Sequence, residues 1–190
     1  MQTHTWGDSL VEHGWAVTPA LLGPAFWQAL EQLKQTTPFQ SLVPAGTGKA
    51  LSFQAQSVRG DRIHWLDGAT SLETTVLQEL EGLRQALRDH LRIPLGEVEA
   101  HMACYPPGAG YARHLDAFRR DNARLVSLVC YLNPAWEEAH GGCLRLHLPQ
   151  GPLDVAPRWG QSALFLSETI EHEVLPSTVE RWSLACWFRR

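Results

Sequence analysis

The chain has 190 residues, of which 44% are hydrophobic and 19% are charged. This balance is typical of a globular protein with a packed core and excludes a disordered or fibrous chain, so we expect one domain over residues 1–190. The formal net charge of -4 provides no global positive field, and we therefore expect no nucleic-acid partner.

The four cysteines, at positions 104, 130, 143 and 186, lie in apolar stretches without CxxC spacing. This pattern argues against a zinc ribbon or a secreted disulfide framework and favours free thiols in a reducing cytoplasm. The N-terminus lacks a cationic start followed by an apolar run, and no stretch of 18 apolar residues occurs. We expect a cytoplasmic protein without a membrane span.

Two amphipathic helices are predicted in the first half of the chain. Apolar residues recur at helical spacing over about 19–35, where Pro24 is tolerable in the first turn. Residues 36–58 are rich in Thr, Pro, Gly and Ser, and are expected to form a loop with one short strand. A longer helix is predicted over about 71–91, with Ser71 as its N-cap.

After Gly96, short runs rich in Val, Leu, Tyr, Cys and Trp alternate with Gly and Pro turns as far as the C-terminus. Strands are expected near 98–105, 111–116, 124–132, 142–148, 153–155, 161–166, 172–175 and 181–188. This order predicts a mainly β fold with N-terminal helices (α+β): a double-stranded β-helix, or cupin-like jelly roll, with helices packed on one outer sheet face. Residues from about 1 to 95 would form the helical support and a substrate loop, and about 96–190 the catalytic jelly roll.

His114 and Asp116 stand two residues apart, so a strand would project both side chains toward the same face. A non-haem iron(II) site of the facial-triad type needs two histidines and one carboxylate, and leaves open positions on the metal. We expect His172 to be the third ligand. An isolated HxD is usually a pair of solvent-exposed polar residues, and only its combination with a distal histidine and with Arg181 makes it specific.

Arg181 lies nine residues beyond His172. The open positions of iron(II) can be chelated by a 2-oxo acid, and the second carboxylate of 2-oxoglutarate then needs a buried partner, for which the planar fork of Arg is suited. On a strand that begins at Arg181, one face carries Ser183, Ala185 and Trp187, and is expected to line the site. The other face is expected to be core, and carries Trp182, Leu184, Cys186 and Phe188.

Five other histidines show no comparable spacing and are interpreted as surface or satisfied core residues. They are His64, His90, His101, His140 and His147.

Several segments resemble the 2-oxoglutarate-dependent prolyl hydroxylases of the hypoxia-inducible-factor type and their bacterial relatives. The segments are VRGDRIHW (58–65), MACYP (102–106), GYARHLD (110–116), YLNPAW (131–136), GGCLRL (141–146), HEV (172–174) and RWSLACW (181–187). They cover the predicted catalytic half and leave the first helix unmatched.

The resemblance implies the same ligands, His114, Asp116 and His172, with Arg181 as the salt-bridge partner of the cosubstrate. It further implies that Tyr131 and Tyr105 donate hydroxyl hydrogen bonds near the cosubstrate carboxylates, and that Leu144 and Trp187 line the pocket.

The resemblance also implies that residues 58–68 form a loop that folds over the substrate. This loop carries Arg59, Asp61 and Trp65, and Asp61 is expected to pair with Arg124.

The implied activity is that of an Fe(II)- and 2-oxoglutarate-dependent prolyl 4-hydroxylase, which consumes dioxygen and gives succinate and carbon dioxide, with ascorbate as a further cofactor. Its substrate would be a prolyl residue of a protein, such as the translation factor elongation factor Tu. Residues 117–122 depart from the Asn-Pro continuation usual in the family. We expect neither the C-terminal helix nor the zinc-binding domain of the animal enzymes in this chain, which favours a bacterial-type member.

Two alternatives stay open at this stage. One is a hydroxylase of free amino acids or small molecules on the same scaffold. The other is a non-catalytic jelly-roll module that senses a metal or an acidic ligand.

Overall fold

The computed structural model describes residues 5–19, 21–46, 59–117 and 123–190. The helices within these ranges are α1 (Trp6–His13), α2 (Pro24–Thr36) and α3 (Ser71–Leu91), together with the 3-10 turns η1 (Phe39–Ser41) and η3 (Glu138–His140). The strands are β1 (Trp15–Thr18), β2 (Val43–Pro44), β3 (Arg62–Trp65), β4 (Glu97–Tyr105), β5 (Tyr111–His114), β6 (Arg124–Tyr131), β7 (Leu144–Leu148), β8 (Gly151–Val155), β9 (Ser162–Leu166), β10 (Glu171–Val174) and β11 (Arg181–Arg189).

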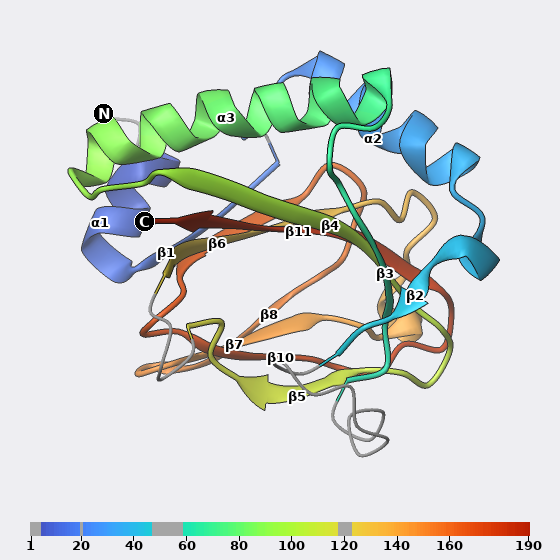
Figure 1. Ribbon diagram of the computed structural model, residues 1–190. Coiled ribbons are helices and arrows are strands. Elements are labelled where there is room, and N and C mark those ends of the chain that lie inside the picture. The colour runs from blue at the N-terminus through green and yellow to red at the C-terminus, as the bar shows by residue number, and fades with distance from the viewer. Residues whose placement is uncertain (1–4, 20, 47–58, 118–122) are drawn as a thin grey trace.

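The strands form two antiparallel sheets that face each other (Figure 1). The major sheet has the order β1-β9-β6-β11-β4-β3-β2, and the minor sheet the order β5-β10-β7-β8. Helices α1, α2 and α3 lie on the outer face of the major sheet, whereas the minor sheet lies on its opposite side. The fold is the predicted mainly β jelly roll with helices packed on one outer sheet face.

The three long central strands, β4, β6 and β11, divide the interior into two halves because successive side chains point to opposite faces. Even-numbered residues join the cluster under the helices: Met102, Cys104, Leu128, Cys130, Trp182, Leu184, Cys186 and Phe188. Odd-numbered residues face the minor sheet: His101, Ala103, Tyr105, Ser127, Val129, Arg181, Ser183, Ala185 and Trp187. The two faces predicted for the strand from Arg181 are therefore observed, and the register extends them to β4 and β6.

The helix caps explain where two of the helices begin. Thr5 and Asp8 form a capping box at the start of α1, a helix that was not predicted from the sequence, and Gly14 ends this helix with φ of 80°. For α3 the N-cap is Thr70, whose side chain accepts a hydrogen bond from the amide of Glu73, and not Ser71 as predicted.

Two predicted segments differ in the structure. Residues 62–65 form β3, which pairs with β4 inside the major sheet, so the predicted loop over 58–68 is wrong for these residues. Val58 lies outside the described residues, as does most of 117–122. The strand predicted over 111–116 ends at His114, which leaves Asp116 just beyond β5.

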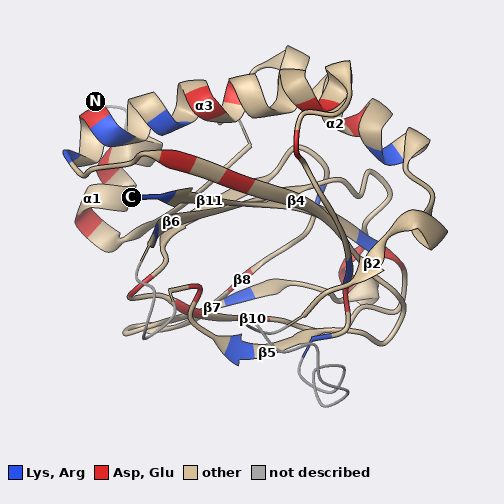
Figure 2. Ribbon diagram, in the orientation of Figure 1, with Lys and Arg blue, Asp and Glu red and all other residues tan. Residues whose placement is uncertain are grey.

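Charged side chains of both signs are interspersed along α3 (Figure 2). Ion pairs also bridge neighbouring strands of the minor sheet: Arg145 with Asp154 at 2.7 Å, His147 with Glu173 at 3.0 Å, and Arg113 with Glu171. All four cysteines are free, as expected. No helix among the described residues is long and apolar enough to cross a membrane.

Candidate active site

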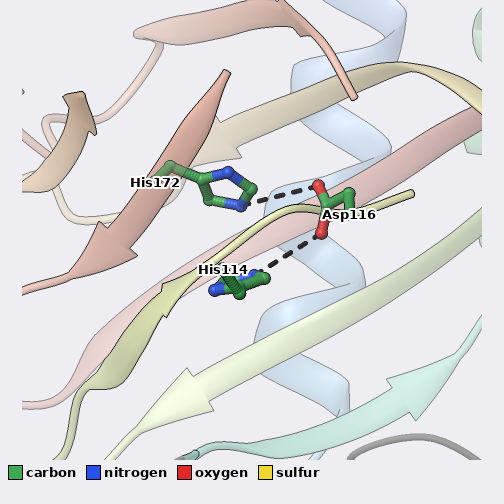
Figure 3. Close-up of side chains that lie close together, drawn as sticks. All are labelled: His114, Asp116 and His172. Carbon is green, nitrogen blue, oxygen red and sulfur yellow. Dashed lines mark ion pairs between the residues drawn. The ribbon is translucent and has the colours of Figure 1, made fainter. Parts of the chain in front are cut away.

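The three predicted metal ligands converge between the two sheets. His114 ends β5 and His172 lies on β10, and the antiparallel register places these two residues directly opposite each other. Asp116 follows β5, and one of its carboxylate oxygens faces each of the two imidazoles (Figure 3). The ligand atoms of all three side chains lie within 4.8 Å of one another.

Each distance in the cluster fits a shared divalent ion. Nε2 of His114 lies 3.6 Å from Oδ1 of Asp116, and Nε2 of His172 lies 3.5 Å from Oδ2 of the same carboxylate. Two imidazole nitrogens and one carboxylate oxygen make up the facial set that suits non-haem iron(II). The donor set therefore fits the metal.

Backbone carbonyls orient both imidazoles. Nδ1 of His114 donates to the carbonyl of Ala112 at 2.8 Å, and Nδ1 of His172 donates to the carbonyl of Ile170 at 3.2 Å. With the proton held on Nδ1, the lone pair of each Nε2 points toward the other ligands. The chain thus fixes the tautomer that a metal requires.

The Asp116 carboxyl is buried, yet it is held in its ionised form. Burial alone would raise its pKa, but the adjacent imidazoles of His172 and His114 and the hydroxyl of Ser127 together lower this pKa well below its usual range. Ser127 donates to Oδ2 at 2.6 Å and lies 2.8 Å from the hydroxyl of Ser167. Burial likewise lowers the pKa of His172, which favours the neutral imidazole.

Arg181 is a buried cation on the odd-numbered face of β11, with an exposure of 2%. Its Nε donates to the carbonyl of Gly142 at 2.8 Å and its Nη1 to the hydroxyl of Ser183 at 3.1 Å. Nη2 has no partner, and the ion pairs among the described residues include no carboxylate for Arg181. A guanidinium in this position is costly unless an anion meets it, so the site fits a carboxylate ligand.

Tyr105 and Tyr131 flank this guanidinium. The Cζ atom of Arg181 lies 5.1 Å from the ring centre of Tyr105 and 5.2 Å from that of Tyr131. The Tyr131 hydroxyl is buried without a partner, so it is free to donate to the same ligand. Leu144 and Trp187 line the same pocket.

Arg59 lines this pocket, but the predicted pairing of Asp61 with Arg124 is wrong. Asp61 instead accepts two hydrogen bonds from Arg59, at 2.7 and 2.9 Å, because residues two apart on an extended chain share a face. Arg124 pairs with Glu99 at 2.9 Å and stacks on Trp187, with its Cζ 3.6 Å from the ring centre.

His101 lines the pocket, although its sequence context suggested only a surface or satisfied core residue. Its ring packs against Trp65 and Trp187, with centres 4.8 and 5.2 Å apart, and its Nε2 lies 3.5 Å from Nη2 of Arg59. The alternation of side chains along a strand could have identified it, because His101 and Tyr105 are both odd-numbered residues and point to the same face of β4. Ser127 was missed for a similar reason, since it contributes only one hydroxyl from an odd-numbered position, whereas Ser183 lies on the face of β11 that was expected to line the site.

The other four histidines lie outside this pocket. Three of them have carboxylate partners: His64 lies 3.0 Å from Glu73, His147 lies 3.0 Å from Glu173, and His90 lies 3.8 Å from Asp8.

Comparison with known proteins assigns the family. The model of the 2OG-Fe(II) oxygenase superfamily matches residues 100–189. Prolyl hydroxylase EGLN3 of Homo sapiens is 30% identical over 180 residues, which cover 88% of this chain and 73% of the relative. The chain spans less of other relatives: its match to Egl nine homolog 1 of Rattus norvegicus covers 43% of that protein.

Two solved structures extend the likeness to nearly the whole chain. A prolyl-4-hydroxylase of Pseudomonas putida is 41% identical, with a TM-score of 0.84 over 97% of both chains. A Trichoplax adhaerens prolyl hydroxylase, in complex with a peptide fragment of the hypoxia inducible factor oxygen degradation domain, is 25% identical. It has a TM-score of 0.80 and covers 97% of this chain and 87% of its own. The chain therefore belongs to the 2OG-Fe(II) oxygenase superfamily and is homologous to the EGLN prolyl hydroxylases.

Proposed function

We propose that this protein is an Fe(II)- and 2-oxoglutarate-dependent prolyl 4-hydroxylase that acts on a prolyl residue of a protein. His114, Asp116 and His172 would hold the iron, and Arg181 would bind the distal carboxylate of 2-oxoglutarate. The observation that carries the proposal is the buried guanidinium without a carboxylate partner, which shares one pocket with the His–Asp–His cluster.

The bound iron, with 2-oxoglutarate and dioxygen, would supply the oxidising chemistry and release succinate and carbon dioxide. The residues of the chain would bind and orient the metal and the cosubstrate. Backbone carbonyls hold the two imidazoles, and Ser127 holds the Asp116 carboxylate. Arg181 and the Tyr131 hydroxyl both offer unused donors to a carboxylate, and charge-assisted hydrogen bonds of this kind are stronger than neutral ones.

The prolyl residue of the substrate would lie against the aromatic wall made by Trp65, His101 and Trp187. The rings of these three residues pack against one another beside the cluster, with centres 4.8 to 6.3 Å apart. Proline-rich peptides characteristically dock on aromatic-lined surfaces. The likeness to the Pseudomonas putida enzyme and to the Trichoplax adhaerens peptide complex supports a protein substrate.

Within this proposal, elongation factor Tu is the candidate substrate, ascorbate the auxiliary reductant and the cytoplasm the location. The four free cysteines support a reducing compartment.

The test is 2-oxoglutarate turnover by the purified protein with Fe(II), measured as succinate release, with and without purified elongation factor Tu. Mass spectrometry of the factor should show the gain of one oxygen atom on a prolyl residue. The same experiment with cell lysate and with free proline separates a different protein substrate from a small molecule. Succinate release that no candidate substrate stimulates, with no oxygen gain on any of them, would contradict the prolyl hydroxylase proposal.

Variants separate the enzyme from a non-catalytic sensor. His114→Ala should abolish turnover, whereas His13→Ala, a histidine at the end of α1, should retain it. Arg181→Lys should raise the KM for 2-oxoglutarate about 10- to 100-fold, since hydrogen bonds to charged groups contribute about 1.5–3 kcal/mol. An unchanged KM in Arg181→Lys would remove the assigned role of this guanidinium.

A further inference from the structure

His114 is the most accessible member of the His–Asp–His cluster. Its side chain is 19% exposed, compared with 8% for Asp116 and 6% for His172. Its only hydrogen bond among the described residues joins Nδ1 to the carbonyl of Ala112, a single bond about which the ring can still tilt. The His172 ring is tilted by 55° to the His114 ring, with the ring centres 4.3 Å apart, so a ring parallel to the imidazole is the contact that would hold its plane.

The ring of Tyr111 provides that contact. It stacks on the His114 imidazole with the ring centres 3.7 Å apart and the planes 19° from parallel. Both residues belong to β5, but they are three apart, so the strand alone does not hold the two rings together. The position of Tyr111 therefore matters for the position of His114.

Arg59 packs on Tyr111 in turn. Its Cζ lies 4.8 Å from the Tyr111 ring centre, and the two residues form an isolated backbone bridge. The amide of Gly60 donates to the carbonyl of Gly110 at 3.0 Å. The approach is so close that a Cβ at Gly60 would lie 2.8 Å from the Cβ of Ala109. Segment 59–61 is thus docked directly on the start of β5.

The docked Arg59 is kept in place by a buried partner. The Asp61 side chain is fully buried, and it accepts both hydrogen bonds of the Arg59 fork. Undocking would expose this pair to water, whereas removal of one partner would leave the other charge buried and uncompensated. A continuous set of contacts therefore leads from Asp61 through Arg59 and Tyr111 to His114.

We propose that Arg59 and Tyr111 are positioning residues for His114, so that metal binding and the docking of segment 59–61 on β5 are thermodynamically coupled. This inference rests on the proposed role of His114 as a metal ligand. Coupling between two sites is reciprocal: if docking raises metal affinity, metal binding must favour docking by the same factor.

The first test measures zinc affinity of the metal-free protein by competition with a chromophoric chelator. Tyr111→Leu removes the stacked ring and should weaken zinc binding by about tenfold, the lower end of effects seen for residues that orient metal ligands. Tyr111→Phe keeps the ring and should bind zinc like the wild type. This pair separates stacking from the hydroxyl group.

Arg59 is tested in the double variant Arg59→Met, Asp61→Asn, which avoids leaving a lone buried carboxylate. Its zinc affinity should fall about threefold, as expected when one cation–π contact of roughly 0.5–1 kcal/mol is lost. The matched control is Arg62→Met: Arg62 bonds the carbonyl of Leu42 and packs on Phe39, away from β5, so its loss should leave zinc affinity unchanged. Thermal melting of each metal-free variant checks that it is folded.

The second test needs no variant. Amide hydrogen exchange of Gly60 reports the bond to Gly110, and saturating zinc should slow it several-fold. The amide of Gly14, bonded to Leu10 at the end of the short helix α1, is the reference and should keep its rate.

Four outcomes would overturn the proposal. Equal zinc affinity of Tyr111→Leu and wild type, or of the Arg59 and Asp61 double variant and wild type, removes the coupling but leaves the metal assignment intact. So does Gly60 exchange that zinc does not slow. A wild-type protein that binds no zinc overturns the coupling and the ligand assignment together.

Discussion

His101 is a neutral histidine in a charged neighbourhood. Burial, and then the adjacent charge of Arg59, lower its pKa to about 4. Its Nδ1 lies 3.3 Å from the carbonyl of Met102, to which it donates, so Nε2 is left as an acceptor that faces the Arg59 guanidinium. The pocket therefore contains an uncharged acceptor between the segment 59–61 and Trp187.

This pKa predicts a pH-dependent stability. Between pH 6.5 and about 4 the unfolded chain binds a proton on His101 and the folded protein does not, so the free energy of unfolding falls as pH falls. We expect the metal-free wild type to lose up to about 3 kcal/mol more than His101→Gln across this window, since one pKa unit corresponds to about 1.4 kcal/mol. Urea unfolding at several pH values, followed by Trp fluorescence, measures the difference. Parallel curves for the two proteins would show that His101 is protonated normally in the fold.

For single residues, the sequence predicted the site where the residue type and its spacing are specific to metal or carboxylate binding. The convergence of His114, Asp116 and His172, and the burial of Arg181, match the prediction from spacing and from the known family. His101 was missed because a lone histidine on a strand carries no such signal. Its place in the pocket depends on the register between β4 and β11, which is a tertiary property.

At the scale of elements, Glu73 joins the start of α3 to the end of β3. Its buried carboxylate accepts hydrogen bonds from the amides of Asp67, Gly68 and Ala69 at 3.0 to 3.2 Å, and lies 3.0 Å from Nε2 of His64. A carboxylate in the first turn also interacts favourably with the helix dipole. Glu73 thus fixes the turn that follows Trp65.

We expect Glu73→Ala to lower the free energy of unfolding by about 2 kcal/mol, because three backbone amides lose an ionised acceptor. Glu79→Ala, on the same helix but without these bonds, should change stability by less than about 0.5 kcal/mol. Chemical denaturation of both variants is the measurement. Similar values for the two would show that the turn holds without its carboxylate.

The elements that the sequence predicted well are those with strong local patterns. The apolar stripe of α3 and the alternation of β11 each specify an element without help from the rest of the fold. β3 was read as loop because its four residues include only one buried apolar side chain, Ile63, and its pairing with β4 decides its conformation. α1 was missed because eight residues give little periodicity, although the capping box of Thr5 and Asp8 is legible in the sequence.

At the scale of the whole molecule, the major sheet separates the core under the helices from the pocket. One face of β11 packs under the helices and the other lines the pocket, so neighbouring residues serve stability and chemistry separately. Leu184 is fully buried in the cluster under the helices. Ala185 lies on the opposite face of β11, which it shares with Trp187, and lines the pocket. Substitutions at these two adjacent positions should therefore have opposite consequences.

Leu184→Ala leaves a cavity in the helix-side core, and we expect it to lower the free energy of unfolding by about 3 kcal/mol. Its 2-oxoglutarate turnover per folded molecule should stay near that of the wild type. Ala185→Leu adds volume to the pocket, where space is open, and should change stability by less than about 1 kcal/mol while turnover falls at least about tenfold. Urea unfolding and succinate release, measured on the same preparations, test both arms. If Leu184→Ala lost turnover at urea concentrations below its midpoint of unfolding, a change on one face of the sheet would have repositioned side chains on the other. A fully active Ala185→Leu would show that this position does not affect the chemistry. Either result would mean that the sheet does not separate the two functions.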